Sequence, residues 1–178
     1  MRRQTRNLML IRRLAPPDAF AFHALRLAAL RECPSAFSSS YEEECETPLT
    51  IIAARLAPDS GRDVFGAFDG AELAGMVVIG REEARKLRHK ASIRGMYVCA
   101  SQRGKGVGRR LLEQALDCAA AMPGLLQVNL SVTASQSAAV ALYQAMGFTV
   151  FAREPGALMV DGVLYEDMQM VRNLPLSD

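Results

Sequence analysis

The loop at residues 102–108, Gln-Arg-Gly-Lys-Gly-Val-Gly, is the feature that most constrains this chain. It follows an apolar, strand-like run that ends near Val98 and precedes an amphipathic helix expected at 104–122. Alternate glycines let the backbone N–H groups approach a ligand closely, and the helix N-terminus adds the positive end of a dipole. Four cations surround the loop: Arg103, Lys105, Arg109 and Arg110. The sequence therefore predicts a strand–loop–helix unit that binds an anion such as a pyrophosphate.

Hydrophobic periodicity and turn residues predict strands and helices over the rest of the chain. Strands are expected at 8–13, 64–68, 73–79, 92–99, 126–132, 148–153, 157–160 and 163–171. Helices are expected at 16–32, near 42–44, and at 47–56, 104–122 and 135–146. Asp-Gly pairs at 69–70 and 161–162 are typical of tight hairpin turns. The order is β-α-α-β-β-β-α-β-α-β-β, without an internal repeat or a linker.

Two positions make this prediction specific enough to check. The strand at 126–132 has a strict period of two, so Leu126 is expected on the same buried face as the other apolar residues, Val128, Leu130 and Val132. Gly147 is expected to end the helix at 135–146 in a left-handed conformation.

Length, charge and cysteine content limit the class of protein. The 178 residues are expected to form one domain, 1–178, and a net charge of +2 gives no electrostatic case for nucleic-acid binding. The apolar run at 8–11 is too short for a signal peptide, and no segment could span a membrane. Four scattered cysteines and two histidines lack metal-ligand spacing. We expect a cytoplasmic protein without a metal ion.

Three kinds of nucleotide-binding loop compete for residues 103–108. A Walker A loop needs Gly, four residues and then Gly-Lys-Ser/Thr, which the chain lacks. A dinucleotide fingerprint needs GxGxxG in an early βαβ unit, but the chain has GxGxG after hairpin-connected strands. The pattern Arg/Gln-x-x-Gly-x-Gly/Ala is met. It resembles motif A of the GNAT superfamily of N-acetyltransferases, which binds the pyrophosphate of coenzyme A.

Two further segments carry the same resemblance. Residues 93–98 resemble the fourth strand of the superfamily, and residues 136–148 resemble its Asn-x-x-Ala-x-x-Leu-Tyr-x-x-x-Gly-Phe helix. Gln136 stands where the superfamily usually has Asn, so an amide is kept on a longer side chain. The order of elements also agrees, and the resemblance covers essentially the whole chain.

The resemblance implies an α+β fold: a mixed, mostly antiparallel sheet of about seven strands, flanked by helices and splayed between strands four and five. It implies acetyl transfer from acetyl-CoA by direct attack of a primary amine of a small molecule, a peptide N-terminus or a lysine. The resemblance is also compatible with a homodimer. The residues that it places at the cofactor are Met96, Tyr97, Val98, Arg103, Gly104, Lys105, Gly106, Val107, Gly108, Arg109, Gln136 and Tyr143.

The resemblance also assigns catalytic roles. The backbone N–H of Val98 would stabilise the negative charge that develops on the thioester oxygen, and the hydroxyl of Tyr143 would protonate the departing thiolate. Periodicity alone favours Tyr143 as a core aromatic. The superfamily often has a glutamate on its fourth strand as the base, and this chain has none there. We therefore rank the cluster at 42–44 first, with Glu44 as the candidate, ahead of Glu82, Glu83 and His89; a water relay would serve equally.

Two other functions remain as alternatives. The missing carboxylate on the fourth strand would suit a non-catalytic module that binds coenzyme A as a sensor or regulator. An oxidoreductase that uses a dinucleotide is disfavoured by the GxGxG spacing.

Overall fold

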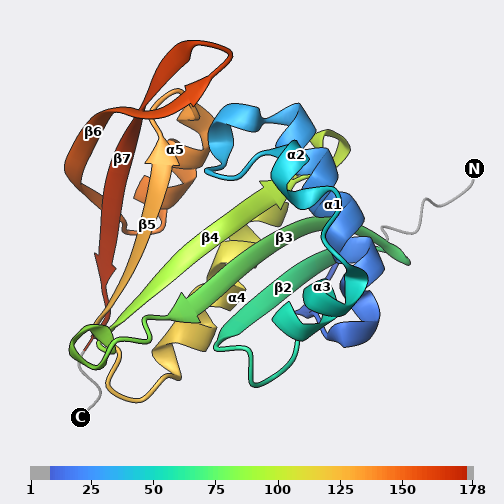
Figure 1. Cartoon of the computed structure of the whole chain (residues 1–178). Helices are drawn as coiled ribbons and strands as arrows, with labels where there is room; N and C mark the ends of the chain where they lie inside the picture. The colour runs from blue at the N-terminus through green and yellow to red at the C-terminus, as the bar shows by residue number, and fades with distance from the viewer. Residues whose placement is uncertain (1–8, 176–178) are drawn as a thin grey trace, which may run out of the picture.

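The structure, a computed structural model, describes residues 9–175. Within this range the strands form one sheet in the order β1-β2-β3-β4-β5-β7-β6 (Figure 1). The strands are β1 (Leu10–Arg13), β2 (Arg62–Asp69), β3 (Glu72–Arg81), β4 (Lys90–Val98), β5 (Gln127–Thr133), β6 (Thr149–Val160) and β7 (Val163–Asn173). Neighbouring strands are antiparallel except the β4–β5 pair. The predicted mixed, mostly antiparallel sheet is confirmed.

Helices cover both faces of the sheet (Figure 1). They are α1 (Ala19–Glu32), α2 (Tyr41–Glu44), α3 (Leu49–Arg55), α4 (Val107–Ala120) and α5 (Ser137–Ala145). Residues of α1 and α3 form one core with β2 and β3, and residues of α4 and α5 form the second core with the opposite face. In α4 the apolar stripe at helical spacing is buried as its periodicity predicts. None of the helices within residues 9–175 is long and apolar enough to cross a membrane.

The β4–β5 pair separates after three residue pairs, and this separation creates the space for the site. The pairs are Lys90↔Gln127, Ala91↔Val128 and Ser92↔Asn129. Beyond them β4 contains a bulge against β3, marked by Gly95 with a φ of +59°. Because β5 stays paired with β7 as far as Thr133 while β4 follows β3, the two strands diverge. The predicted splay between strands four and five is confirmed.

The bounds of several elements differ from the sequence prediction. The helix expected from Gly104 begins at Val107, because Gly104 and Gly106 have φ values of +73° and +79°, outside the right-handed helical region. Leu126 precedes β5 instead of joining its buried face, and its side chain is 41% exposed. Gly147 has the expected left-handed conformation, with a φ of +85°.

The two edge strands of the sheet, β6 and β1, also differ from the sequence prediction. The strands expected at 148–153 and 157–160 are one strand, β6, whose register against β7 shifts between Glu154 and Leu158. A bulge absorbs the extra residues there, so the chain does not need to leave the sheet. The first strand, expected at 8–13, is observed as Leu10–Arg13, and Leu8 lies outside the described residues.

Candidate active site

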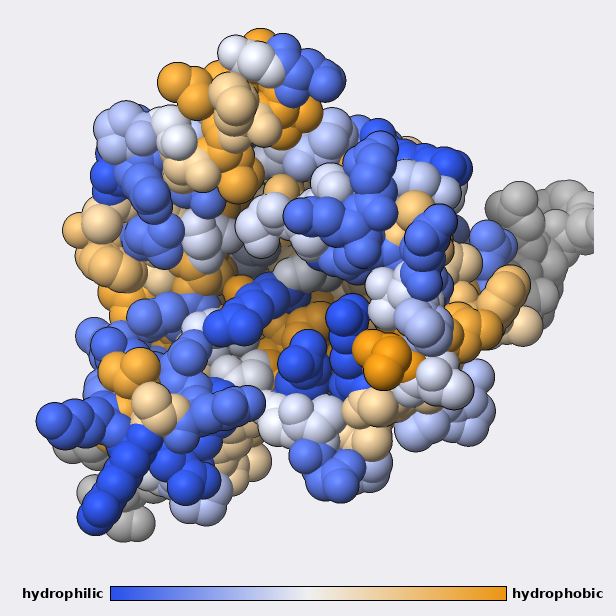
Figure 2. Space-filling view, viewed as in Figure 1, coloured by the Kyte–Doolittle hydropathy of each residue, from blue (hydrophilic) through white to orange (hydrophobic). Residues whose placement is uncertain are grey.

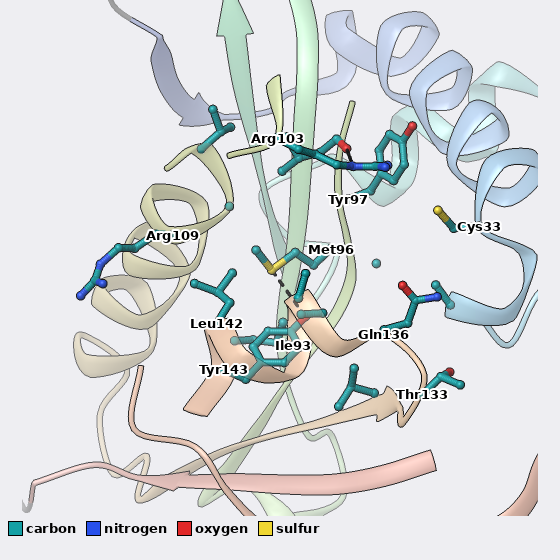
Figure 3. A pocket seen from close by; sticks show the side chains of 18 of the residues that line it. Cys33, Ile93, Met96, Tyr97, Arg103, Arg109, Thr133, Gln136, Leu142 and Tyr143 are labelled. Atoms are coloured by element: carbon teal, nitrogen blue, oxygen red, sulfur yellow. Dashed lines mark hydrogen bonds between the residues drawn. The ribbon is translucent and has the colours of Figure 1, made fainter. Parts of the chain in front are cut away.

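The divergence of β4 and β5 opens a cavity of about 450 Å³. Its walls come from β4, the loop before α4, the first turn of α4, the end of β5 and α5 (Figure 3). Eleven of the twelve residues predicted to contact acetyl-CoA line it: Met96, Tyr97, Val98, Arg103, Gly104, Gly106, Val107, Gly108, Arg109, Gln136 and Tyr143. Lys105 does not line the cavity, and its ammonium donates to the side chain of Gln102 at 3.1 Å.

The glycine loop presents backbone N–H groups to this cavity. Gly106 is the N-cap of α4, and a Cβ on either Gly104 or Gly106 would meet no atom within 4 Å. The first intrahelical bond is donated by the N–H of Arg110 to the carbonyl of Gly106 at 3.1 Å. The N–H groups of residues 107–109 therefore have no partner within the helix and are available to an anion.

Arg103 is held by protein groups. Its guanidinium lies 2.6 Å from a carboxylate oxygen of Glu32 at the end of α1, and its Nε donates to the carbonyl of Val98 at 2.9 Å. The hydroxyl of Tyr97 donates to the same carboxylate. Hydrogen bonds from Tyr97 and Arg103 hold the pKa of Glu32 below its ordinary value. This cluster ties the glycine loop to β4 and α1, and sequence reasoning missed Glu32.

Arg109 also has a protein partner. Its Nε lies 3.1 Å from Glu113 one turn further along α4, and both side chains are about half exposed. Figure 3 shows the Arg109 side chain directed away from Met96 and Tyr143. Since Arg103 and Lys105 are paired as well, the predicted anion site would rest mainly on backbone N–H groups and the helix dipole. Cofactor contacts by these three side chains remain predictions.

Tyr143 combines a core position with access to the cavity. Its side chain is 7% exposed, and its ring packs edge-on against Phe148 with centroids 5.9 Å apart. The hydroxyl points to the sulfur of Met96 on β4, 3.5 Å away (Figure 3). Burial raises the pKa of Tyr143 to about 12. A thioether sulfur is a weak acceptor, so the single hydroxyl proton of Tyr143 is only weakly held at the cavity wall.

The backbone at Val98 faces the gap between the diverging strands. In an antiparallel ladder, residues bonded to the neighbouring strand alternate with residues whose N–H and C=O groups point away from it. The N–H of Cys99 donates to Ala74 on the β3 side at 2.8 Å. Val98, one residue earlier and opposite Gly75, therefore directs its N–H and C=O away from β3. Its carbonyl accordingly accepts from Arg103, and its N–H is suited to a developing oxyanion.

Glu44, the candidate base, is held in an ion pair outside this cavity. Its carboxylate accepts from Arg26 at 2.9 Å and from the hydroxyl of Ser39 at 2.6 Å. Burial raises the pKa of Glu44, but the hydrogen bonds from Arg26 and Ser39 outweigh burial, and the pKa lies below its ordinary value. These contacts do not favour proton abstraction by Glu44, and its catalytic role remains a prediction without support from the geometry.

The ion pair predicts a pH dependence of stability. Because the pKa of Glu44 is lower in the folded protein, its stabilising contribution is complete above the unfolded pKa, near 4.5. The contribution disappears as the pH falls through the folded pKa. We expect Glu44→Gln to lower the melting temperature at pH 7 and to have a much smaller effect at pH 3. Glu42→Gln, on the same helix but exposed, is the control; equal effects of both substitutions at pH 7 would contradict the prediction.

A second cavity of about 490 Å³ adjoins the first at the diverging strands. Both cavities are lined by Ile93, Arg94 and Gly95 of β4 and by Thr133 of β5. Arg26 and Asp167 line only the second cavity, and the sequence offered no signal for either, since each is a single charged residue within an ordinary element. Figure 2 shows a hollow in the middle of the face in view, with hydrophilic residues around its rim.

Comparisons with known proteins agree with this architecture. The model of a family described as Acetyltransferase (GNAT) family matches residues 24–148. An acetyltransferase of the GNAT family from Streptococcus pneumoniae superposes with a TM-score of 0.82 at 24% identity, over 93% of this chain and 99% of that chain. The yncA protein of Salmonella typhimurium, solved with its cofactor acetyl-CoA, has a TM-score of 0.76 at 21% identity, over 96% of each chain.

A third structure is a ribosomal-protein-alanine N-acetyltransferase from Brucella melitensis. It superposes with a TM-score of 0.76 at 21% identity, over 93% of this chain and 99% of that chain. A search of curated proteins found no match. At these identities the superpositions establish the fold, and the family match extends over well more than half of the chain.

Proposed function

Since the chain belongs to the GNAT acetyltransferase family, we propose that it transfers an acetyl group from acetyl-CoA to a primary amine of a small molecule or peptide. One observation carries the proposal. The glycine loop, the inward-facing backbone at Val98 and the hydroxyl of Tyr143 line a single cavity between the diverging strands. These are an anion site, an oxyanion donor and a proton donor, the three groups that acyl transfer from a charged thioester requires.

The cavity is suited to coenzyme A. Gly104 and Gly106 leave the backbone bare at the N-terminus of α4, which suits a pyrophosphate. Gln136, the N-cap of α5, and Leu142 line the opposite wall. Bound acetyl-CoA supplies the thioester that is attacked. We propose that the N–H groups at the start of α4 hold the pyrophosphate and that Gln136 contacts the arm leading to the thioester.

The amine must lose its proton before it attacks. With an unperturbed pKa near ~10.4, an alkyl amine forms the neutral nucleophile at pH 7 at a cost of about 4–5 kcal/mol. Among the described residues that line the 450 Å³ cavity there is no carboxylate and no histidine. We propose that water in the cavity relays this proton to solvent.

Val98 and Tyr143 would then act on different atoms of the thioester, its oxygen and its sulfur. The N–H of Val98 stabilises the oxyanion, and one such donor is typically worth ~2.7–4 kcal/mol. The Tyr143 hydroxyl donates a proton to the departing thiolate. A pKa of about 12 makes the phenol a weak acid toward a thiol of pKa ~8.5. Burial in the same cavity would also raise the pKa of the thiol, and this reduces the difference between the pKa of the thiol and the pKa of the Tyr143 hydroxyl.

A non-catalytic sensor of coenzyme A is the second candidate, because the cavity that would hold the thioester lacks a carboxylate base among its described lining residues.

Calorimetry with acetyl-CoA, followed by a thiol-release assay over a panel of amines and peptides, distinguishes the acetyltransferase from the sensor. We expect micromolar binding and acceptor-dependent thiol release, with NAD as the non-binding control. Tight binding without transfer to any acceptor would favour the sensor, and no binding at millimolar acetyl-CoA would reject both.

A further inference from the structure

The second cavity is bounded by walls of different charge. One wall comes from α1, β4 and the loop after α1, and it includes Arg26, Phe37 and Gly95. The other comes from β5, β6 and β7, and it includes Ser131 and Asp167. Arg26 and Asp167 each carry a buried polar atom that has no hydrogen-bond partner among the described residues. Both residues line the cavity, so a molecule bound there would lie between an arginine on one wall and a carboxylate on the other.

Hydrogen bonding holds one carboxylate oxygen of Asp167 in place, and the other oxygen has no hydrogen-bond partner among the described residues. Its Oδ2 accepts from the hydroxyl of Ser131 at 2.8 Å, and that hydroxyl accepts from the amide of Gln169 at 3.1 Å. Its Oδ1 is buried and unpaired. No ion pair to Asp167 is found within residues 9–175, whereas the adjacent Glu166 pairs with Arg153 at 2.6 Å. The cavity therefore contains a rigid carboxylate without a protein cation.

Arg26 contributes little net charge to the cavity. Its Nε and Nη2 are taken by Glu44 and Ser39, and its guanidinium lies 4.6 Å from the centroid of the Phe37 ring. Only Nη1 is free, and it would lie 3.8 Å from a Cβ on Gly95, at the bulge of β4. The other cation of the cavity, Arg94, is 72% exposed and faces Glu82 at 3.4 Å. The charge in the cavity that has no ion pair within residues 9–175 is that of Asp167, a partly buried residue.

We propose that the acceptor amine carries a second cationic group, an ammonium or guanidinium, which binds to Asp167. This inference rests on the proposed acetyl transfer and specifies its acceptor class: diamines, polyamines and amines of basic peptides. The second cavity adjoins the first, the proposed thioester site, along residues 93–95. An acceptor that spans the second cavity therefore presents one nitrogen to the first cavity, while its other end reaches β7.

The attacking nitrogen itself does not suit Asp167. A carboxylate beside an amine favours its protonated form, which has no lone pair for attack. The wall at the bulge of β4 carries no carboxylate among its described lining residues, so it does not stabilise the protonated form of the amine there. The two walls thus orient a dication, with the end at β7 charged and the end at β4 able to lose its proton.

A pair of amines of equal length tests the inference. Acetylation of 1,4-diaminobutane and of butylamine is compared in wild type and in Asp167→Asn. We expect wild type to favour the diamine at least about tenfold in kcat/KM, the scale of a charge-assisted hydrogen bond. Asp167→Asn should remove most of this preference by raising KM for the diamine, and leave butylamine unchanged. Glu166→Gln, one residue away on the same strand and outside the cavity, should leave both amines unchanged.

The possible outcomes distinguish a failure of the dication site from a failure of the proposed acetyl transfer. If wild type acetylates both amines at equal efficiency, or if Asp167→Asn slows both equally, the dication site is wrong while acetyl transfer stands. If wild type acetylates no amine in the panel although it binds acetyl-CoA, the proposed function fails and the acceptor class falls with it. The wild-type comparison needs no variant, so equal efficiency with the two amines overturns the inference even if Asp167→Asn does not fold.

Discussion

Gly106→Asp is expected to weaken acetyl-CoA binding by about 100-fold or more while the fold survives. A carboxylate about 5 Å from a phosphate is repelled by roughly 3 kcal/mol at an effective dielectric constant of ~20, and about 1.4 kcal/mol corresponds to tenfold in Kd. A Cβ at Gly106 meets no atom within 4 Å, so the side chain itself fits. The left-handed backbone adds a strain of about 1–2 kcal/mol. Calorimetry gives the affinity, and a thermal melt gives the stability.

Gly106→Asn is the matched control, since asparagine has the same size as aspartate and tolerates the left-handed conformation equally well. We expect it to retain most of the affinity, which assigns the loss in Gly106→Asp to charge. Gly108→Asp should weaken binding at least as much as Gly106→Asp and should in addition lower the melting temperature. A Cβ there would lie 3.3 Å from the methyl group of Met96 and 3.4 Å from Leu142. Unchanged affinity in both aspartate variants would mean that the loop is only a turn.

Tyr143→Phe is expected to lower kcat on the order of 10²-fold, the usual scale for a general acid, with little change in acetyl-CoA affinity or stability. The ring is what packs against Phe148, and phenylalanine keeps it. The hydroxyl has only the Met96 sulfur as a partner within the described residues, so its removal leaves no strong acceptor unsatisfied. Steady-state kinetics with a confirmed acceptor, beside calorimetry and thermal melts, measures all three quantities.

Tyr165→Phe is the control, because Tyr165 lies on β7 and lines neither cavity. It should be neutral in every assay. If Tyr143→Phe is also fully active, the tyrosine is a core aromatic and another group protonates the thiolate. A large loss of stability in Tyr143→Phe would instead mean that the hydroxyl satisfies a buried partner.

Features encoded over short stretches of sequence were predicted correctly. The apolar stripe of α4, the hairpin of β2 and β3 and the left-handed Gly147 depend on residues a few positions apart. Propensity and periodicity act at that range. The start of α4 was misplaced by three residues, because the left-handed conformations of Gly104 and Gly106 are outside the helical region and hydrophobic periodicity does not detect them.

The residues near the site that prediction missed have their partners far away in the chain. Glu32 meets Arg103 and Tyr97 only because the end of α1 packs beside β4, and Arg26 holds Glu44 only because α2 folds back against α1. A list of charges cannot tell a free carboxylate from a paired one, so the sequence ranked Glu44 as a base and overlooked Asp167.

The sequence by itself determined the strands, the amphipathic helices and the anion-binding loop, since each follows from neighbouring residues. Tertiary structure decided where the strands separate, because the bulge at Gly95 keeps β4 with β3 while β5 stays with β7. It also decided which charges remain available, because pairing and burial depend on how distant elements pack. Arg103 is held by Glu32 and Val98, while the N–H groups of residues 107–109 have no partner within the helix and Asp167 has no ion pair within residues 9–175.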